Sequence, residues 1–591
     1  MTTSIGPEGT AETTSTQDRA SDAASAAAAT GMLICYMREG GNWRPIPADE
    51  VPDLAEQGDT FLAALPFPDE RSMLLAGVRH LSPTHRHRFR MPVRIAMAGG
   101  EPWPVTLDTL SGMLADEFAE PDEVSDDPTA PGTRGPDPTF QLARIRQSVA
   151  AVSSFLRARE NEIVALWSAE PMTFIASEQA SLLGDIAQPA PKSRWELTPE
   201  HLEAYAPERG ASFALRWLAV DPALVEHDSA AQTSAPQLTE QLLRDDAATD
   251  GAALDAALEG LGERVLLPVH PWQFERLQDD RAFTKLRDDG LVADLGELGS
   301  PVTATASLNT VYREDWPWQL TFPLSAHLSN DAQPAGTQEL ERGVTAARQL
   351  DGDVGRQAAQ IAPQLVLLRA PAYLSVRRDG EPIEGLGVQL RENRWRSGTD
   401  AAGADVSSAG TLAQDHPYGG ASRLAQIVRG LAAAGGGSEE EVARAWFGRY
   451  LDVVIAPQMR LHLEVGLEID ADQQLMLLEL DGGWPARGVL RDGHGYLEPG
   501  ADAAAAVEAL VPLGIINALG VAGFVDERVL LGDLRDLLER ERERGGRYPT
   551  TLLDRVLDDA MWRVQSTLRR GLEQDDDLFV MVPNPLHGLA R

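Results

Sequence analysis

An apolar run that ends in a group of ring and polar residues is the feature that most constrains the fold of this chain. Residues 264–269 are apolar enough to form a buried strand, and an HPWQ box at residues 270–273 follows directly. About 35 residues later, a Thr/Ala/Val-rich run ends in a second polar box at residues 307–310. Strands that deliver polar side chains at their ends are typical of binding sites. This stretch therefore predicts a sheet that carries the site.

The length and composition of the chain are those of a globular protein with several subdomains. A chain of 591 residues, 43% of them hydrophobic, can bury sizeable cores. No uninterrupted apolar run is long enough to span a membrane, and the N-terminus lacks the basic-then-apolar signal pattern. We therefore expect a cytoplasmic protein with no membrane partner. The single cysteine, Cys35, excludes an internal disulfide and a cysteine metal cluster.

The charge balance is strongly acidic and poor in lysine. The formal net charge is −38, and Lys192 and Lys285 are the only lysines among the basic residues. A high-GC genome explains the preference for arginine. A halophilic source, whose proteins stay soluble in high salt through acidic surfaces, explains both features and is the interpretation we favour. Nucleic acid is excluded as a partner, because such a chain repels phosphate backbones and carries no basic stripe.

The pattern along the chain divides it into four parts. Residues 1–30 are a Ser/Thr/Ala-rich tract predicted to be a disordered acidic tail. An N-terminal subdomain covers 31–180, a central subdomain with the polar boxes covers 181–400, and a largely helical C-terminal subdomain covers 401–591. Local patterns predict further elements, namely strands at Leu33–Met37 and Val93–Ala98 and helices at Phe140–Leu166, Ala503–Leu510 and Thr551–Leu572.

Three histidines stand close together in the N-terminal part. His80, His85 and His87 lie in RHLSPTHRHRFR, without an acidic or cysteine partner at metal-ligand spacing. The interleaved arginines would repel a cation. We therefore predict a basic surface patch here and no metal site.

Five motifs in a fixed order resemble those of the IucA/IucC family, the NRPS-independent siderophore synthetases. The first, GDIAQPAPKSRWE at 184–196, is similar to the family pattern GHPxHPxxKxRxG. The HPWQ box follows, and residues 307–310 occupy the place of an SxRT box. Residues 466–492 resemble GxxxExHxQN…RD, and VPNPL at 582–586 resembles the terminal NPL signature. The resemblance runs from about Phe140 to the C-terminus, and the order is more specific than any single motif.

The resemblance implies a fold and a reaction. The fold is an α+β cupped hand with mixed and antiparallel sheets and a mostly helical C-terminal part, in which residues 181–400 form the ATP and substrate cleft. The reaction uses ATP to join a carboxylate such as citrate to an amine or alcohol through an acyl-adenylate, releasing AMP. Catalysis then relies on positioning and charge stabilisation. A homodimer, or a heteromer with another synthetase, is the expected assembly.

The resemblance also implies site residues, although it identifies no catalytic acid or base. The residues expected to bind ATP are Lys192, Arg194, Ser307, Asn309, Thr310 and Arg391. Those expected to bind substrate are His270, Gln273, Asp470 and Gln473. Glu468 and Asp492 stand at the family's magnesium positions, and carboxylate oxygens are the ligands that Mg²⁺ prefers.

The chain departs from the family at positively charged and histidine ligands. The substituted positions are Asp185, Gln188, Asn309, Gln319 and Asp470. Phosphoryl transfer depends on positive charge, so these losses bear on activity. Two explanations remain open. The chain is a diverged synthetase with a relocated set of side chains, drawing on Arg313, His327, Arg391 and His462, or it is a non-catalytic paralogue that pairs with or regulates an active synthetase.

Overall fold

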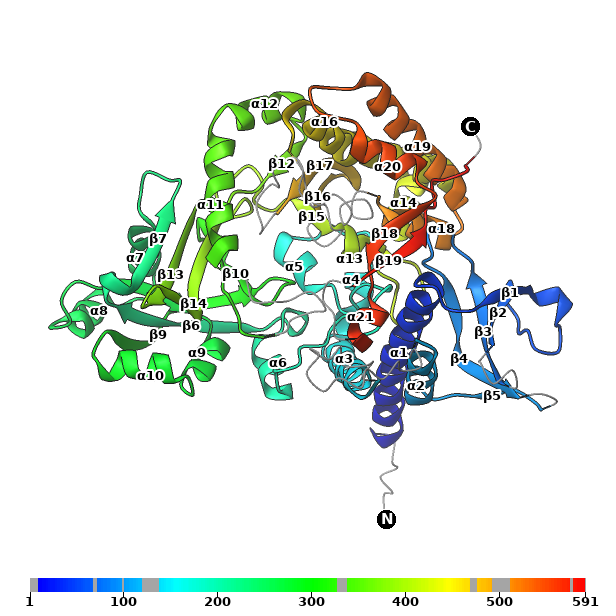
Figure 1. The fold of residues 1–591 in the computed structure, drawn as a ribbon, viewed down its shortest axis with the longest axis horizontal. Helices are drawn as coiled ribbons and strands as arrows, with labels where there is room; N and C mark the ends of the chain where they lie inside the picture. The colour runs from blue at the N-terminus through cyan, green and yellow to red at the C-terminus, as the bar shows by residue number, and fades with distance from the viewer. Residues whose placement is uncertain are drawn as a thin grey trace, which may run out of the picture.

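The structure is a computed structural model that describes residues 9–66, 72–97, 100–118, 138–326, 337–467, 476–491, 511–573 and 578–589. These residues form an α+β protein with three main parts, which Figure 1 shows around a common centre. A small sheet and three helices form the N-terminal part, a large sheet forms the central part, and helices around a second small sheet form the C-terminal part. The predicted fold class is confirmed, whereas the subdomain boundaries stay predictions.

The N-terminal part begins with a long helix and continues as an antiparallel meander. The sheet has the strand order β1-β2-β3-β4-β5, and every neighbouring pair is antiparallel. Two further helices pack against the first. The elements are α1 (Gly9–Arg38), β1 (Arg44–Pro47), β2 (Phe61–Pro66), β3 (Ser72–His80), β4 (Arg88–Met97), β5 (Trp103–Pro104), α2 (Leu107–Phe118) and α3 (Pro138–Ala158).

Helix α1 corrects two predictions made for the start of the chain. Residues from Gly9 onward are helical and not a disordered tail, and the strand expected at Leu33–Met37 is the last part of the same helix. Alanine has the highest helix propensity, and Ala20 and Ala24 bury one face of α1 against the core that α3 shares. Low complexity therefore concealed a helix, and a short apolar run cannot distinguish a strand from a buried helix.

The central part is an eight-stranded sheet in the order β7-β13-β14-β11-β10-β9-β6-β8, antiparallel throughout. Its strands, shown in green in Figure 1, alternate between a face packed on an apolar core and a polar face. The strands are β6 (Ser212–Val220), β7 (Val225–Ser229), β8 (Val265–Val269), β9 (Val292–Ala304), β10 (Thr310–Tyr312), β11 (Trp318–Thr321), β13 (Ala372–Arg378) and β14 (Glu381–Glu392). The strand predicted before the HPWQ box is β8.

Short helices connect and cover these strands. Most of them begin at a side chain that caps the helix N-terminus, as Thr198 and Asp280 do. They are α4 (Ile163–Leu166), α5 (Phe174–Gln179), α6 (Pro199–Tyr205), α7 (Ala235–Arg244), α8 (Gly251–Leu258), α9 (Pro271–Leu277), α10 (Arg281–Asp288), α11 (Thr337–Asp351) and α12 (Asp353–Ile361).

The C-terminal part packs helices around a four-stranded sheet, ordered β12-β17-β16-β15, and holds the largest apolar core. A two-stranded sheet, β18 with β19, follows. The elements are β12 (Leu365–Leu367), β15 (Asp405–Ser408), α13 (Ala409–Ala413), α14 (Arg423–Gly435), α15 (Glu439–Tyr450), α16 (Ala456–Val465), β16 (Met476–Asp481), β17 (Trp484–Leu490), α18 (Leu513–Val521), α19 (Glu527–Arg544), α20 (Thr551–Asp558), β18 (Met561–Gln565), α21 (Leu568–Glu573) and β19 (Phe579–Pro583).

The helix predicted over Thr551–Leu572 is wrong in its middle. Residues 561–565 form β18, in which Trp562 and Val564 point inward and their neighbours point outward. This alternation with period two is the pattern of a half-buried strand. Asn584 of the NPL signature lies nearby and donates from its amide to the carbonyls of Val556 and Asp559, so it holds the end of α20.

Within the described part of the chain, no helix has both the length and the apolar character that a membrane span requires.

Candidate functional site

The polar face of the central sheet gathers side chains from three neighbouring strands. Cross-strand register places Gln319 opposite Arg391, and Thr321 opposite both Gln389 and Thr310. Because side chains alternate along a strand, these residues share one face, and Leu320 and Leu390 enter the apolar core on the other. The pairing therefore brings Thr310 and Arg391, two predicted ATP ligands, onto one surface.

Several buried polar atoms on this face lack a partner within the described structure. Gln319 is 1% exposed, and neither its amide oxygen nor its amide nitrogen makes a described hydrogen bond. Gln389 is 2% exposed, and its amide nitrogen also makes no described hydrogen bond. Leaving such a group buried and unsatisfied costs about 1–3 kcal/mol, so native proteins keep few of them. A polar ligand on this face is the arrangement that satisfies these amides.

The predicted SxRT box forms a tight turn at the edge of this face. Leu308 has φ of 66°, which places Ser307 and Asn309 on either side of a left-handed residue. The hydroxyl of Ser307 lies 3.2 Å from that of Thr305, and Thr310 shares a hydrogen bond of 2.9 Å with Thr321. The hydroxyls of Ser307 and Thr310 are therefore each held by a threonine outside the box.

Glu178 on α5 connects this box to the predicted RD pair. One of its carboxylate oxygens accepts a hydrogen bond of 3.1 Å from the backbone N–H of Ala306 and also pairs with Arg491. Ala306 precedes Ser307, and Arg491 belongs to the predicted RD pair. The Glu178 side chain is fully buried, and its other oxygen, Oε1, has no hydrogen-bond partner in the described part of the chain. A single carboxylate thus ties the turn before Ser307 to Arg491, which lies 313 residues from Glu178 in the sequence.

Lys192 and Arg194 converge on a second buried carboxylate. Glu208 accepts from Lys192 Nζ at 2.8 Å and from both terminal nitrogens of Arg194 at 2.7 and 3.0 Å. Burial opposes ionisation of this carboxyl, but the charges of Arg194 and Lys192 outweigh it and lower the pKa of Glu208 to about 2. Two cations share one anion, so the group keeps a net charge of +1. Lys192 carries three N–H donors, of which this contact uses one.

Asp185 explains one departure from the family pattern. Arg86 binds this carboxylate with both terminal nitrogens, at 2.7 and 3.4 Å. The ion pair holds the pKa of Asp185 below its usual range, although burial alone would raise it. Asp185 also accepts from the backbone N–H of Ala187. It is therefore an anchor of the 184–196 loop in this chain.

The three histidines near Arg86 do not form the predicted basic surface patch. His87 is 3% exposed, and burial together with the neighbouring His85 and His80 lowers the pKa of its imidazole to about 3. Its Nδ1 accepts from the backbone N–H of Ser82. The error has a physical reason: His87 lies in the loop between β3 and β4, and its ring turns inward to accept from the backbone of Ser82, which a charge pattern alone does not reveal.

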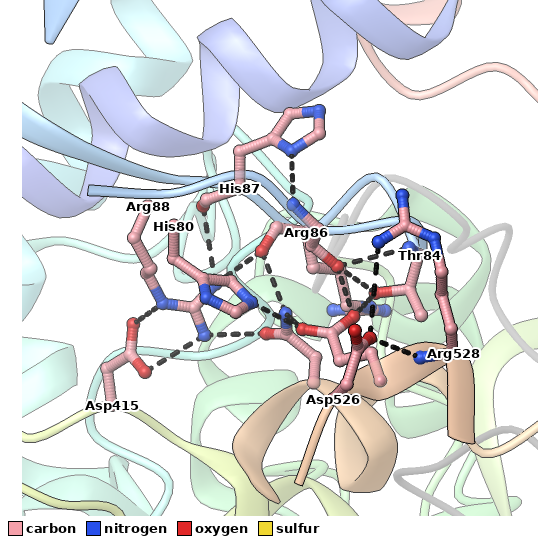
Figure 2. Close-up of polar contacts among 11 residues, drawn as sticks. His80, Thr84, Arg86, His87, Arg88, Asp415, Asp526 and Arg528 are labelled. Atoms are coloured by element: carbon pink, nitrogen blue, oxygen red, sulfur yellow. Dashed lines mark hydrogen bonds and ion pairs between the residues drawn. The ribbon is translucent and has the colours of Figure 1, made fainter. Parts of the chain in front are cut away.

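The loop between β3 and β4 instead joins the N-terminal part to α18 and α19 through Glu527. Figure 2 shows His80 and Thr84 close to Asp526, the residue that caps α19. One oxygen of the buried Glu527 carboxylate lies 2.5 Å from His80 Nε2 and accepts from the amide of Asn517 at 2.9 Å. The other accepts from the hydroxyls of Ser82 and Thr84. We call these five residues the Glu527 junction. Each carboxylate oxygen in it has two donors.

The HPWQ box is occupied with contacts inside the fold. His270 is fully buried, caps α9 by accepting from the backbone N–H of Trp272, and lies against the rings of Tyr205 and Phe213. Burial lowers the pKa of His270 to about 3. Gln273 accepts from the backbone N–H of Ser325 at 2.8 Å and donates to its hydroxyl. These contacts give the box a structural role, His270 Nε2 makes no hydrogen bond within the described residues, and substrate binding by His270 and Gln273 stays a prediction.

The remaining predicted ligands lie outside the described residues, as does the predicted helix Ala503–Leu510. They are Glu468, Asp470, Gln473 and Asp492, together with His327. Within the described ranges, no three His, Cys, Asp or Glu side chains are grouped to hold a metal ion.

Two functional candidates were missed by the sequence analysis. Neither Glu178 nor Glu208 belongs to a motif that can be recognised in the sequence. Their partners become evident only in the folded chain, because Glu178 meets Arg491 across 313 residues.

Comparison with known proteins places these motifs in a family context. The sequence description of the IucA / IucC family matches residues 173–414, and that of the ferric iron reductase FhuF-like transporter matches residues 444–579. The rhizobactin siderophore biosynthesis protein RhbC of Rhizobium meliloti is 30% identical over 81% of this chain and 84% of its own length. A spermidine-citrate ligase of Bacillus anthracis is 25% identical over 94% of this chain and 96% of its own.

The fold has a close counterpart among solved structures. ATP-bound aerobactin synthetase IucA of Klebsiella pneumoniae superposes with a TM-score of 0.82 at 25% identity, covering 95% of this chain and 99% of that one. The match extends through all three parts described above, and so includes the polar face of the central sheet.

Proposed function

Because the chain belongs to the IucA/IucC family of siderophore synthetases, we propose that it condenses a citrate-like carboxylate with an amine or alcohol at the expense of ATP, as an enzyme of siderophore biosynthesis. Relatives support the proposal directly, since one is named a spermidine-citrate ligase and a solved counterpart is an aerobactin synthetase with bound ATP. The alternative of a non-catalytic paralogue gains no support from these relatives.

The reaction has two steps that balance without a redox partner. A carboxylate oxygen attacks the α-phosphorus of ATP, and the bond to pyrophosphate breaks. The lone pair of the amine or hydroxyl then attacks the acyl carbon, the bond to AMP breaks, and the nucleophile loses a proton. Both steps develop negative charge on phosphate oxygens, so fixed donors aimed at those oxygens supply most of the stabilisation.

The convergence at Glu178 is the observation that carries the proposal. Its carboxylate joins the turn before Ser307 to Arg491, and the neighbouring Lys192 completes a set drawn from three motifs. We infer that this framework fixes the hydroxyls of Ser307 and Thr310 for contact with phosphate oxygens. The unsatisfied amides of Gln319 and Gln389 fit a polar ligand on the same face, because they offer both donors and acceptors.

The charged residues of the site have distinct proposed roles. Arg391 supplies a delocalised cation on the polar face, and Lys192 with Arg194 supplies the net positive charge left after pairing with Glu208. Asn309 contributes an amide in place of the family arginine. Gln319 stands in place of a family lysine and contributes hydrogen bonds without charge. More of the negative charge on the phosphates is therefore balanced by the metal.

Mg²⁺, the substrate contacts and the cellular setting complete the proposal. We assign the metal to Glu468 and Asp492, and part of the carboxylate substrate to Asp470 and Gln473, on the family pattern. The protein acts in the cytoplasm as a homodimer or with a second synthetase. The acidic, lysine-poor composition suits high salt, so assays belong in both ordinary and molar KCl.

Titration calorimetry of Mg-ATP, with and without citrate, tests the proposal. We expect binding in the micromolar to low-millimolar range, weakened by Arg391→Ala and abolished by Asp492→Ala. Arg356→Ala is the matched control, because Arg356 is an exposed α12 residue whose loss changes the net charge equally. Absence of Mg-ATP binding to folded protein would refute the proposed function.

A further inference from the structure

A polar groove lies between the three helices of the N-terminal part and shares no residue with the candidate site. Its volume is about 490 Å³, within the range of small-molecule sites. Helices α1, α2 and α3 all pack against one another, and Figure 1 shows them together at the lower edge of the molecule. The family reaction assigns no role to this groove.

One wall of the groove is a single face of α3. Arg146, Ala150, Ser153 and Arg157 all line it, and their spacing of four, three and four residues puts them on one side of a helix. A rise of 1.5 Å per residue sets the two arginines about 16 Å apart. The small side chains between them leave an elongated space. On the facing wall, Ser21 and Ser25 stand one turn apart on α1.

The groove carries positive charge in a strongly acidic protein. Arg146 pairs with Asp108 at the first turn of α2, whereas Arg157 has no ion pair with any carboxylate in the described ranges. Two arginines against one aspartate leave a charge of +1, in a chain whose formal net charge is −38. Guanidinium groups suit carboxylates and phosphates, because their planar N–H donors match two oxygens at once.

A buried hydroxyl in the α3 wall also lacks a partner. Ser153 is 4% exposed, and its Oγ makes no hydrogen bond within the described structure. A hydroxyl in this condition is rare in native proteins, where buried polar groups are normally satisfied. An oxygen of a ligand seated in the groove would give Ser153 an acceptor one helical turn from Arg157.

We propose that this groove binds a small anion, with its phosphate or carboxylate group at Arg157, and that the bound anion stiffens the two helices that hold the 184–196 loop. Phosphate and carboxylate groups are recognised in the same way here, because both present paired oxygens to a guanidinium. A ligand of this kind acts at a distance from the polar face of the sheet.

The opposite side of α3 makes the first connection to the loop. Ser148 accepts a hydrogen bond of 3.1 Å from the backbone N–H of Lys192, and Gln147 accepts one of 3.0 Å from that of Arg194. These two α3 residues lie next to Arg146 in the helix. A ligand that restrains α3 in the groove therefore also restrains the backbone of Lys192 and Arg194.

Helix α1 makes the second connection. Gly31 lies so close to the loop that a Cβ atom there would stand 2.4 Å from the carbonyl oxygen of Gln188. One turn later, the thiol of Cys35 donates to the carbonyl of Ala187 at 2.9 Å. Two of the three helices that wall the groove, α1 and α3, thus contact the same loop. A ligand that bridges these two helices links its occupancy to the loop through contiguous contacts.

Titration calorimetry with two probes on the full-length protein tests the binding. Glycerol 3-phosphate represents the phosphate class, and glutarate represents the dicarboxylate class. We expect saturable binding of one equivalent of at least one probe, and the stronger probe identifies the class. Arg157→Ala and Ala150→Phe, the latter filling the groove, should each weaken it at least about tenfold. Arg356→Ala, the exposed control on α12, should leave it unchanged.

Hydrogen exchange on the same samples tests the connection to the loop. With the bound probe, the amides of Lys192 and Arg194 should exchange more slowly, and Ala150→Phe should abolish the effect of the probe. No binding of either probe, or equal binding to Ala150→Phe, would overturn the groove as a site. Binding without slower exchange at these amides would overturn the coupling. Neither experiment depends on catalysis, so both are independent of the proposed function.

Discussion

The polar face of the central sheet and the Glu527 junction are both buried and polar, yet they differ in how completely they are satisfied. At the junction, each oxygen of Glu527 accepts from two donors. On the sheet face, both amide atoms of Gln319 and one of Gln389 have no partner in the described part of the chain. The comparison distinguishes a region that stabilises the fold from a region that binds a ligand. Buried polar groups with all their hydrogen bonds formed stabilise a fold, whereas buried groups that lack partners can form hydrogen bonds with a ligand.

The largest expected effect comes from removing the carboxylate at the junction. Glu527→Ala leaves four donors, those of His80, Ser82, Thr84 and Asn517, without their acceptor and should lower the free energy of unfolding by about 4 kcal/mol. Urea denaturation measures the change. Glu543→Ala on the exposed side of α19 is the control, with an expected loss below about 0.5 kcal/mol. Equal losses in the two variants would contradict the structural role of the junction.

Glu178 should combine a stabilising and a functional role. Glu178→Gln keeps the shape but removes the charge that pairs with Arg491, and we expect a loss of about 3 kcal/mol in unfolding free energy. Mg-ATP affinity should fall as well, because a neutral amide oxygen holds the Ala306 N–H and Arg491 more weakly than the carboxylate does. Denaturation and calorimetry on one preparation give both values. A variant as stable as the wild type, with unchanged affinity, would remove Glu178 from the framework.

The pH dependence of stability tests whether His270 of the HPWQ box stabilises the fold, as the Glu527 junction does, or is available to a ligand, as the sheet face is. His270 is neutral in the fold, with its pKa lowered to about 3 by burial, whereas in the unfolded chain it titrates near 6.5. Protonation below about pH 6.5 therefore favours the unfolded state, and the wild type loses stability as pH falls toward 3.

The variant His270→Asn keeps an acceptor for the N–H of Trp272 but does not titrate. Between pH 7 and 5, it should lose about 2 kcal/mol less stability than the wild type. Denaturation curves at both pH values measure this difference. The same pH slope in both proteins would show that His270 is solvated and available to a substrate.

The smallest stability effect is expected on the sheet face. Gln319→Leu removes an unsatisfied amide and should leave unfolding free energy unchanged or raise it by about 1 kcal/mol. Mg-ATP affinity should nevertheless weaken about tenfold, because the ligand loses hydrogen bonds. The exposed Gln360→Leu in α12 controls for the added apolar surface. Destabilisation of Gln319→Leu with normal affinity would reverse the comparison between the two regions.

The sequence anticipated what depends on local pattern and ordered motifs. The strand before the HPWQ box and the strand predicted from Val93 onward follow from local apolar pattern and correspond to β8 and to the end of β4, and the α+β class followed from the resemblance. Thr310 and Arg391 were predicted from motif position alone, and the β10–β11–β14 register brings both to one face.

Long-range pairing and burial were not accessible from the sequence. The Arg491–Glu178 ion pair spans 313 residues, and no spacing rule predicts it. His87 was misjudged because its neighbours are arginines, whereas its own side chain points inward. The first half of helix α1 was missed because its buried residues are alanines, such as Ala20 and Ala24, which carry little hydrophobic signal.

The exchange of pyrophosphate into ATP tests the central claim most directly, because it reports formation of an acyl-adenylate before any nucleophile is known. With Mg-ATP and citrate, the wild-type protein should catalyse the exchange, and omission of citrate should abolish it. Gln319→Leu should retain citrate dependence at a reduced rate. Folded protein that binds Mg-ATP yet shows no exchange with citrate or related carboxylates would contradict the account of this chain as a carboxylate-activating synthetase.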